Sequence, residues 1–545
     1  MTGVDVGLIG GEMVTWTDDD PDRDRIPAGG PVLLELLARA LPSAARVLVA
    51  GPHQHALVDA VVAASSQVTC LLRSLPDAEA LAERHPEATV VCGGLDKFSA
   101  AEPFDVIVAL DGMDRLGSVD GADLSWAESL ARLTRALSPD GLLLVALENE
   151  FGVHRLVDPA LPDAVSDGDW RPAFGHDATR PTDPDRLTAA LAQEGLAVQG
   201  AFTGYPLPRR PAVLARTTLF DTAPDLLGTL TAAACSQGFE GREVLADPRR
   251  TVRDAIRTGL GVRLAPQWFA VARRSPEPAA LPELLVAGDG SELWEVVGKR
   301  GGYVRRLVGA PHQSLPIPAG RTLEELLLDA CAHEDIPPVR ALLRDFAGWL
   351  AEQDPAVRLS ATTGNVVHDG TRFTLLTPGP QGAEPVSLEL ALAAVLRRFA
   401  VRLVSGGYRH PWPPGHDVDG ILLIWLSMAG HPLDREDLPA VVELSGTPAA
   451  VEPPPGRREL LAEVERLRGA AAAADSRLAG FQRALERTDR ELTERVQQLE
   501  KTRQELKSVK ATLKTLRSSL PYRVGRVVKR SPDKIRRIVR KPKNF

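Results

Sequence analysis

Residues 47–61 have the sequence VLVAGPHQHALVDAV, an apolar run that stops at Gly51 and resumes after His55 with helical spacing. The first part predicts a buried strand and the second part a helix. A strand that ends at a glycine and leads into a helix presents backbone N–H groups to a ligand, and several glycines normally let the backbone approach that ligand closely. This turn has one glycine, so the stretch predicts the shape of a nucleotide-type site and leaves open whether it still binds one.

The alternation of strand and helix patterns continues through the first half of the chain. Further strands and helices are predicted at residues 67–73, 89–94, 104–111, 125–137, 141–149 and 183–195. Strands that alternate with helices of this length predict parallel βαβ units. The sequence therefore predicts a doubly wound α/β sheet over residues 1–275, with a crevice at the carboxyl ends of its strands.

Composition excludes several classes of protein. The four cysteines lie far apart with no C-x-x-C pair, so neither a disulfide framework nor a metal site is indicated. The N-terminus lacks the basic segment of a signal peptide, and the apolar run at residues 420–430 is too short to cross a bilayer. We therefore expect a cytoplasmic protein.

Residues 40–275 resemble the class I S-adenosylmethionine-dependent methyltransferases. The resemblance rests on the loop after the first strand, on FDVIVALDGMDRL (104–116) and on SPDGLLLVALEN (138–149). ENEFGVHRL and GYPLPRRPAVL look like a subgroup found with bacterial surface-polysaccharide genes, in which a kinase-like domain and a coiled coil follow. The resemblance implies S-adenosylmethionine as cofactor and a cell-surface glycan or its lipid-linked precursor as methyl acceptor.

The chain departs from this family at the cofactor loop. The family's G-x-G-x-G pattern falls on Gly51, His53 and His55, so two of its three glycines are imidazoles here. The family's second strand ends in an acidic residue that binds the ribose hydroxyls, yet this chain has Arg73 there and no carboxylate before Asp77. We therefore expect weak or absent cofactor binding.

The strand ends supply the candidate site residues. The cofactor-binding candidates are Gly51, His53, His55, Gly93 and Asp111, and the catalytic candidates are Glu148, Asn149 and His53. Each has a structural alternative. The imidazoles are either a rebuilt ligand site or tolerated loop residues, Asp111 is either a pocket residue or a solvated carboxylate, and Glu148 with Asn149 forms either a site or a structural turn.

Residues 284–445 predict a second unit of α+β type. Its stretch SATTGNVVHDGTRFTLLTPG resembles the catalytic and metal loops of kinase-like folds, where an Asp precedes an Asn by five residues and a later Asp holds magnesium. Asn365 is present, but Ser360 stands at the base position and Thr377 at the metal position. Lys299 is either a remnant of the phosphate-pairing lysine or a solvated strand end. The resemblance implies a degenerate kinase-like domain.

A Pro-rich linker at 446–456 leads into an apolar 4-3 repeat over residues 457–520. From Leu478 onward leucine recurs at every seventh position, whereas the alternate seam positions include Thr488 and Arg495. Such a heptad predicts a coiled coil and hence a homo-oligomer. The alternative is a single long helix that lies on its own protein.

The C-terminal tail, residues 521–545, holds ten Lys or Arg and one Asp, a local charge of +9. Ile535, Ile538 and Val539 fall on one face of a predicted helix, and a basic amphipathic segment suits an anionic membrane surface. Nucleic acid is not expected because the tail has few aromatic residues to stack on bases and the rest of the chain is acidic. A solvated tail is the alternative.

Two functions are compatible with the sequence. One is a methyltransferase acting on a surface glycan, held at the inner face of the cell membrane by the coiled coil and tail. The other is a non-catalytic scaffold that organises glycan-assembly enzymes at that membrane. Binding of S-adenosylmethionine separates the two.

Overall fold

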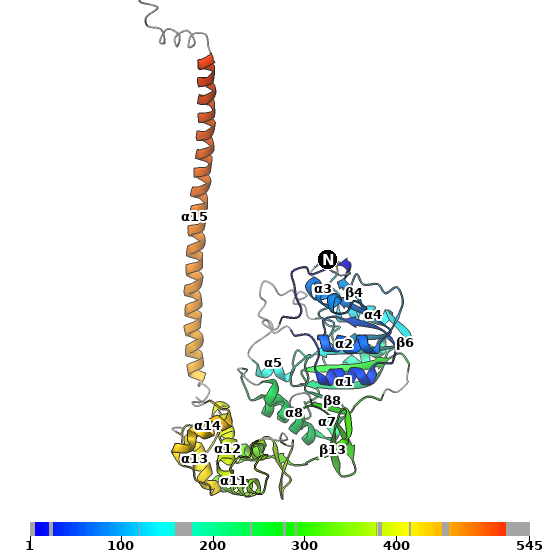
Figure 1. Ribbon diagram of the computed structural model, residues 1–545, viewed down its shortest axis with the longest axis vertical. Helices are drawn as coiled ribbons and strands as arrows, with labels where there is room; N and C mark the ends of the chain where they lie inside the picture. Colours follow the sequence, from blue (N-terminus) through cyan, green and yellow to red (C-terminus); the bar gives the residue numbers. More distant parts are fainter. Residues whose placement is uncertain are drawn as a thin grey trace, which may run out of the picture. The chain divides into compact units, whose positions relative to one another are not determined.

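The computed structural model describes residues 6–20, 26–118, 120–158, 177–239, 242, 244–275, 280–288, 292–377, 379, 384–413, 416–448 and 457–518. The chain divides into two compact units, Met1–Pro454 and Pro455–Phe545. Figure 1 shows the sheet and helices of the first unit and the single long helix of the second. The linker residues 449–456 and the tail residues 519–545 lie outside the described residues.

One large sheet organises the first unit. Its strands are β1 (Val6–Gly10), β2 (Arg46–Ala50), β3 (Gln67–Leu72), β4 (Thr89–Gly93), β5 (Phe104–Ala109), β6 (Leu137–Glu148), β7 (Ala197–Tyr205), β8 (Val213–Arg216), β9 (Gln267–Arg273), β10 (Leu284–Ala287), β11 (Leu293–Lys299), β12 (Gly302–Leu307) and β13 (Ala310–Ile317). Their order in the sheet is β1-β4-β3-β2-β5-β6-β9-β7-β8-β10-β11-β12-β13. The first six in this order are parallel, and β9 runs antiparallel between β6 and β7. The doubly wound, mixed α/β sheet expected from the sequence is confirmed.

Helices cover both faces of the parallel part. They are α1 (Pro31–Ala40), α2 (His55–Ala64), α3 (Leu75–Arg84), α4 (Trp126–Arg135), α5 (Val153–Val157), α6 (Pro184–Gln193), α7 (Leu219–Thr222), α8 (Pro224–Gly238) and α9 (Pro248–Arg257). Along β2, Val47 and Val49 join the core beneath α1, α2 and α3, whereas Leu48 and Ala50 join the core beneath α4, α6, α8 and α9. Because successive side chains of a strand point to opposite faces, an apolar run such as VLVA requires cover on both sides.

The sheet continues past residue 284, where the sequence suggested a new unit. β10 pairs antiparallel with β8, with Leu285 opposite Leu214. Leu284 and Val296 belong to the same core as the buried side chains of α4, α6, α8 and α9. The strands of residues 284–317 are therefore an extension of the first sheet, and a division of the chain at 275–284 would leave the edge of β8 unpaired.

The rest of the first unit is mainly helical and has its own core. Its elements are β14 (Arg321–Thr322), α10 (Leu323–Ala332), α11 (Ile336–Ala351), the 3-10 turn Arg358–Ser360, β15 (Val366–His368), β16 (Phe373–Leu375), α12 (Leu388–Ser405), α13 (Val418–Ala429), the 3-10 turn Arg435–Asp437 and α14 (Leu438–Ser445). Phe346, Phe399 and Trp425 lie at its centre. β14, β15 and β16 form a separate small sheet.

Buried ion pairs join this helical part to α9. Glu324 on α10 accepts from Arg249 at 2.9 Å and also contacts Arg402 of α12. Its neighbour Glu325 pairs with Arg257. Burial raises the pKa of Glu325, but the arginine contacts outweigh it and hold that pKa below its usual value. Charged side chains thus fix the helical part against the sheet region.

The second unit is the helix α15 (Arg457–Ser518), which confirms the long helix expected over residues 457–520. The apolar side chains of its 4-3 repeat are exposed in the single chain, for example Leu478 at 60% and Phe481 at 75%. Assembly through this seam stays a prediction. Among the helices of the described ranges, none has the length and apolar character needed to span a bilayer.

Replacing Glu324 by Gln is expected to destabilise the first unit, because Arg249 and Arg402 then lose a buried counter-charge. The expected loss in unfolding free energy is about 3 kcal/mol, seen as a lower Tm in a thermal melt of the full chain. Glu334→Gln is the matched control, since Glu334 pairs with Arg409 at the surface and exposed pairs contribute about 0–1 kcal/mol. Equal melting temperatures for the two variants would contradict the role given to Glu324.

Candidate functional site

The carboxyl ends of the parallel strands bring several of the candidate residues to one edge of the sheet. Gly51 follows β2, Gly93 ends β4, Asp111 follows β5 and Glu148 ends β6. Because these four strands are parallel, their ends meet at the same edge, where ligands of doubly wound sheets bind. Gly93 has a φ of +147°, and a Cβ on it would lie 2.5 Å from the carbonyl oxygen of Gly10, so this glycine permits the close approach of β1.

His53 joins two strand ends. Its Nδ1 lies 3.0 Å from the carbonyl oxygen of Gly51, and the backbone N–H of Leu110 donates to its Nε2 at 3.1 Å. This pairing places the ring proton on Nδ1 and leaves neither nitrogen free for a substrate. Burial lowers the pKa of His53, which keeps the ring neutral. His53 therefore acts as a structural cross-link, whereas His55 is an exposed residue at the start of α2.

The segment before α1 lies across the turn that follows β2. Ala28, fully buried, forms a bridge with His53, and its carbonyl oxygen accepts from the backbone N–H of Gln54 at 2.9 Å. The backbone N–H of Ala28 donates to the Asp111 carboxylate at 2.9 Å, and Arg115 pairs with the same carboxylate at 2.8 Å. Asp111 thus binds the protein's own chain.

Arg73 occupies the position where the resemblance places the ribose-binding acid, and it is paired with Asp18. Its Nε and Nη2 donate to the two oxygens of Asp18 at 2.9 and 2.6 Å, and both side chains are buried. The Trp16 ring lies against the guanidinium of Arg73, with 5.6 Å between the ring centroid and the guanidinium carbon. Burial raises the pKa of Asp18, but Arg73 outweighs it and the pKa lies below its usual value.

Asp18 is not among the residues predicted from the sequence. Its only local signal was an arginine directly after an apolar strand, which requires a counter-charge when buried. Nothing in the N-terminal pattern showed which carboxylate supplies it.

Glu148 and Asn149 are fixed by neighbouring groups. Glu148 accepts from Arg155 and Arg209, each at 2.9 Å. Although burial raises the pKa of Glu148, Arg209 and its other cationic neighbours hold it well below the usual value, so this carboxylate stays ionised. The Asn149 amide donates to the carbonyl oxygens of Arg263 and Ala265 at 2.7 and 2.8 Å. These bonds favour the structural turn over a catalytic role for Asn149.

The residues that the sequence compared with kinase loops form a structural contact. The Asn365 amide donates to the carbonyl oxygens of Ser360 and Thr377 at 2.9 and 2.8 Å, which ties the two loops together. Neither Ser360 nor Thr377 offers a carboxylate, and Lys299 is exposed at the end of β11. Across the described ranges no cluster of three His, Cys, Asp or Glu side chains is suited to hold a metal ion.

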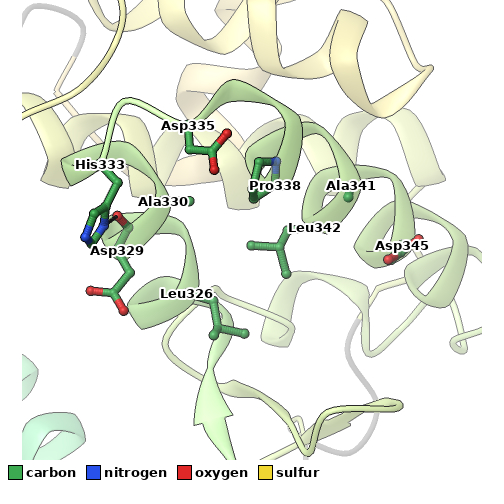
Figure 2. Close-up of a pocket in the computed structure, with 9 residues that line it drawn as sticks. All are labelled: Leu326, Asp329, Ala330, His333, Asp335, Pro338, Ala341, Leu342 and Asp345. Carbon is green, nitrogen blue, oxygen red and sulfur yellow. Dashed lines mark hydrogen bonds between the residues drawn. The ribbon is translucent and has the colours of Figure 1, made fainter.

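A separate hollow lies between α10 and α11 (Figure 2). It has a volume of about 400 Å³, with Leu326, Pro338 and Leu342 on its apolar side and Asp329, Asp335 and Asp345 around it. The carboxylate of Asp329 accepts from Arg321 at 2.7 Å. This hollow lies away from the strand edge and includes none of the candidate residues.

Comparison with known proteins found no matching family model and no matching curated protein. Solved structures do match. The N-methyltransferase NodS of Bradyrhizobium japonicum, in complex with S-adenosylhomocysteine, is 20% identical, with a TM-score of 0.19 over 24% of this chain and 65% of that one, less than two thirds of its length. A TehB-like S-adenosylmethionine-dependent methyltransferase of Corynebacterium glutamicum is 22% identical, with a TM-score of 0.21 over 31% of this chain and 74% of that one. A Mesorhizobium loti S-adenosylmethionine-dependent methyltransferase is 16% identical, with a TM-score of 0.25 over 44% and 96% of the two chains.

The cross-link made by His53 predicts a pH-dependent stability. Because the folded-state pKa of His53 is lowered from 6.5, its contribution is fully present above about pH 6.5 and is lost as the pH falls toward the folded pKa. The Tm of the full chain should therefore fall more steeply between pH 7 and pH 5 than the Tm of His53→Gln. His55→Gln, which changes an exposed ring, should keep the wild-type slope. Parallel slopes for wild type and His53→Gln would refute this role.

Proposed function

We propose that this chain is a methyltransferase-fold protein of bacterial surface-polysaccharide assembly that organises glycan-assembly enzymes and binds S-adenosylmethionine only weakly. The observation that carries the proposal is the buried pair of Arg73 and Asp18, which stands where the resemblance places the ribose carboxylate. The assignment to surface polysaccharides rests on the resemblance of ENEFGVHRL and GYPLPRRPAVL alone.

The strand edge does not fit the cofactor in the way that the resemblance implies. A neutral ribose diol at Arg73 would displace the Asp18 carboxylate and leave a buried guanidinium without its counter-charge. Separating such a pair costs about 3–5 kcal/mol, which corresponds to a loss of affinity of roughly 150-fold to 5,000-fold. Weak binding of S-adenosylmethionine follows from this cost.

The residues nominated as catalytic also favour a non-catalytic role. A general base needs a lone pair within reach of the acceptor proton and enough basicity to take that proton. The cations around Glu148 hold its pKa well below the usual value, which makes it a weak base. Glu148 is held by two arginines, both nitrogens of His53 are engaged, and Asn149 forms a turn. None of the three is placed to take a proton from a glycan hydroxyl.

Methyl transfer is the second candidate function. It is favoured by the turn at Gly51, which keeps a φ of +88° and opens at the same edge as Gly93, Asp111 and Glu148. In this alternative the segment that contains Asp18 withdraws and the cofactor takes its place.

Calorimetric titration of the full chain with S-adenosylmethionine separates the two functions. We expect no saturable binding below about 100 µM ligand, because of the charge left on Arg73. Circular dichroism of the same sample serves as the folding control. A dissociation constant in the micromolar range or tighter would overturn the proposal and favour the enzyme.

We also propose that α15 assembles the chain into a parallel homo-oligomer and that the tail, residues 521–545, binds the anionic inner face of the membrane. The seam of α15 is exposed and apolar. In a parallel pair, Glu505 of one helix falls next to Lys510 of the other, since the two occupy facing g and e positions of the heptad. Several basic tails would then act together at one end of the rod.

Sedimentation of the full chain with and without anionic vesicles tests this assembly. The wild type should sediment as an oligomer, and the double variant Leu492→Asp with Leu499→Asp as a monomer that binds vesicles at least tenfold more weakly through lost avidity. Gln497→Asp with Gln504→Asp adds the same charge away from the seam and should stay oligomeric. Higher salt should weaken vesicle binding. A monomeric wild type, or equal binding to neutral vesicles, would disprove the model.

A further inference from the structure

Arg73 stands at the position that reads the ribose in doubly wound nucleotide sites. It directly follows β3 and comes about 20 residues after the glycine turn at Gly51. In such sites an acidic residue at this place binds the free ribose hydroxyls, whereas an arginine accommodates a phosphate on the ribose. An arginine at the end of β3 therefore indicates a ligand with a negative charge on its ribose.

Asp18 provides the negative charge that Arg73 requires. The carboxylate meets the guanidinium through two parallel hydrogen bonds, the geometry with which arginine also binds phosphate. Asp18 comes from a segment outside the named helices and strands, which a β-bridge between Met13 and Ser74 holds beside β3. The Asp77 carboxylate accepts from the backbone N–H of Asp18, and Arg115 donates to the Asp18 carbonyl oxygen. A ligand that replaces Asp18 must bring its own negative charge, because a neutral group leaves the cation buried alone.

A second polar group beside Arg73 lacks a partner. The Ser118 hydroxyl is buried, with 1% of the residue exposed, and has no hydrogen-bond partner among the described residues. Its neighbour Gly117 accepts from Arg73 at 3.2 Å. Around the hydroxyl lie Gly11 and Gly94, whose added Cβ atoms would come within 2.4 and 3.4 Å of it. Gly121 lies beside the hydroxyl as well, and the Asp96 carboxylate lies near Gly94 and Gly121. The unpartnered hydroxyl is thus a second polar group beside Arg73 for a ligand that displaces the segment around Asp18.

We propose that the edge formed by Gly51, Arg73 and Ser118 binds a nucleoside that carries a phosphate on its ribose, with the phosphate paired to Arg73 in place of Asp18. Asp18 then holds the anion position while no ligand is bound. This inference goes beyond the proposed scaffold function, and it names a ligand class different from S-adenosylmethionine, whose ribose carries no phosphate.

Calorimetry of the full chain with three probes tests the inference. Adenosine 2′-monophosphate is expected to bind at least tenfold more tightly than adenosine and at least tenfold more tightly than inorganic phosphate. Asp18→Asn, which keeps the side-chain shape and removes the competing charge, should tighten binding of adenosine 2′-monophosphate about tenfold further. Equal affinity for adenosine and its phosphate in Asp18→Asn would overturn the proposal, and so would equal affinity for inorganic phosphate.

A double variant guards against a loss of folding. Arg73→Gln alone would bury the Asp18 carboxylate without its partner, so it is combined with Asp18→Asn to give a neutral pair of similar shape. A thermal melt confirms that this variant folds. The double variant should bind adenosine 2′-monophosphate and adenosine equally, and a retained preference for the phosphate would assign it to another site. Because none of the probes contains methionine, this test and the S-adenosylmethionine titration can fail independently.

Discussion

The carboxyl edge of the sheet depends on the ion pair between Arg73 and Asp18. A guanidinium buried at the end of a strand requires a counter-charge, and Asp18 supplies one from 55 residues earlier in the chain. Meeting this requirement draws the N-terminal segment across the ends of β3 and β2. The same segment then supplies Ala28 to the turn at His53 and to the carboxylate of Asp111.

The neighbouring buried carboxylates are also paired with opposite charges, which arginines from other loops supply. Asp111 pairs with Arg115, and Glu148 pairs with Arg209 from the turn between β7 and β8. Arg209 has a φ of 62°, a left-handed conformation that costs a non-glycine residue about 1 kcal/mol or more. Its backbone N–H donates to Gln267 at 2.6 Å, which together with the ion pair holds this conformation. The charges of the edge are thus matched by the protein itself.

Local pattern was enough to predict the sheet region and the long helix. The apolar runs of β2 and β5 and the leucine repeat of α15 are short-range features of the sequence. Each of them predicts an element that the structure contains. The pairing of β8 with β10 was not predictable in this way, because register between distant strands leaves no local signal. For the same reason the sequence indicated that Arg73 follows a buried strand but did not indicate that Asp18 pairs with it. The candidate residues were located at strand ends, but their hydrogen bonds, which decide between chemistry and structure, come from other segments.

The extension of the sheet through β13 bears on what this protein can do. β10 pairs with β8 and shares its core, and β11, β12 and β13 continue the sheet from it. Glu324 and Glu325 then tie α10 to α9 through buried arginines. A hinge between the residues before 275 and those after 284 would have to break strand hydrogen bonds and buried ion pairs together. The strand pairing and the buried ion pairs therefore hold the parts of the first unit in a fixed arrangement. A ligand at the strand edge would act by displacing the segment around Asp18 and not by moving one part against the other.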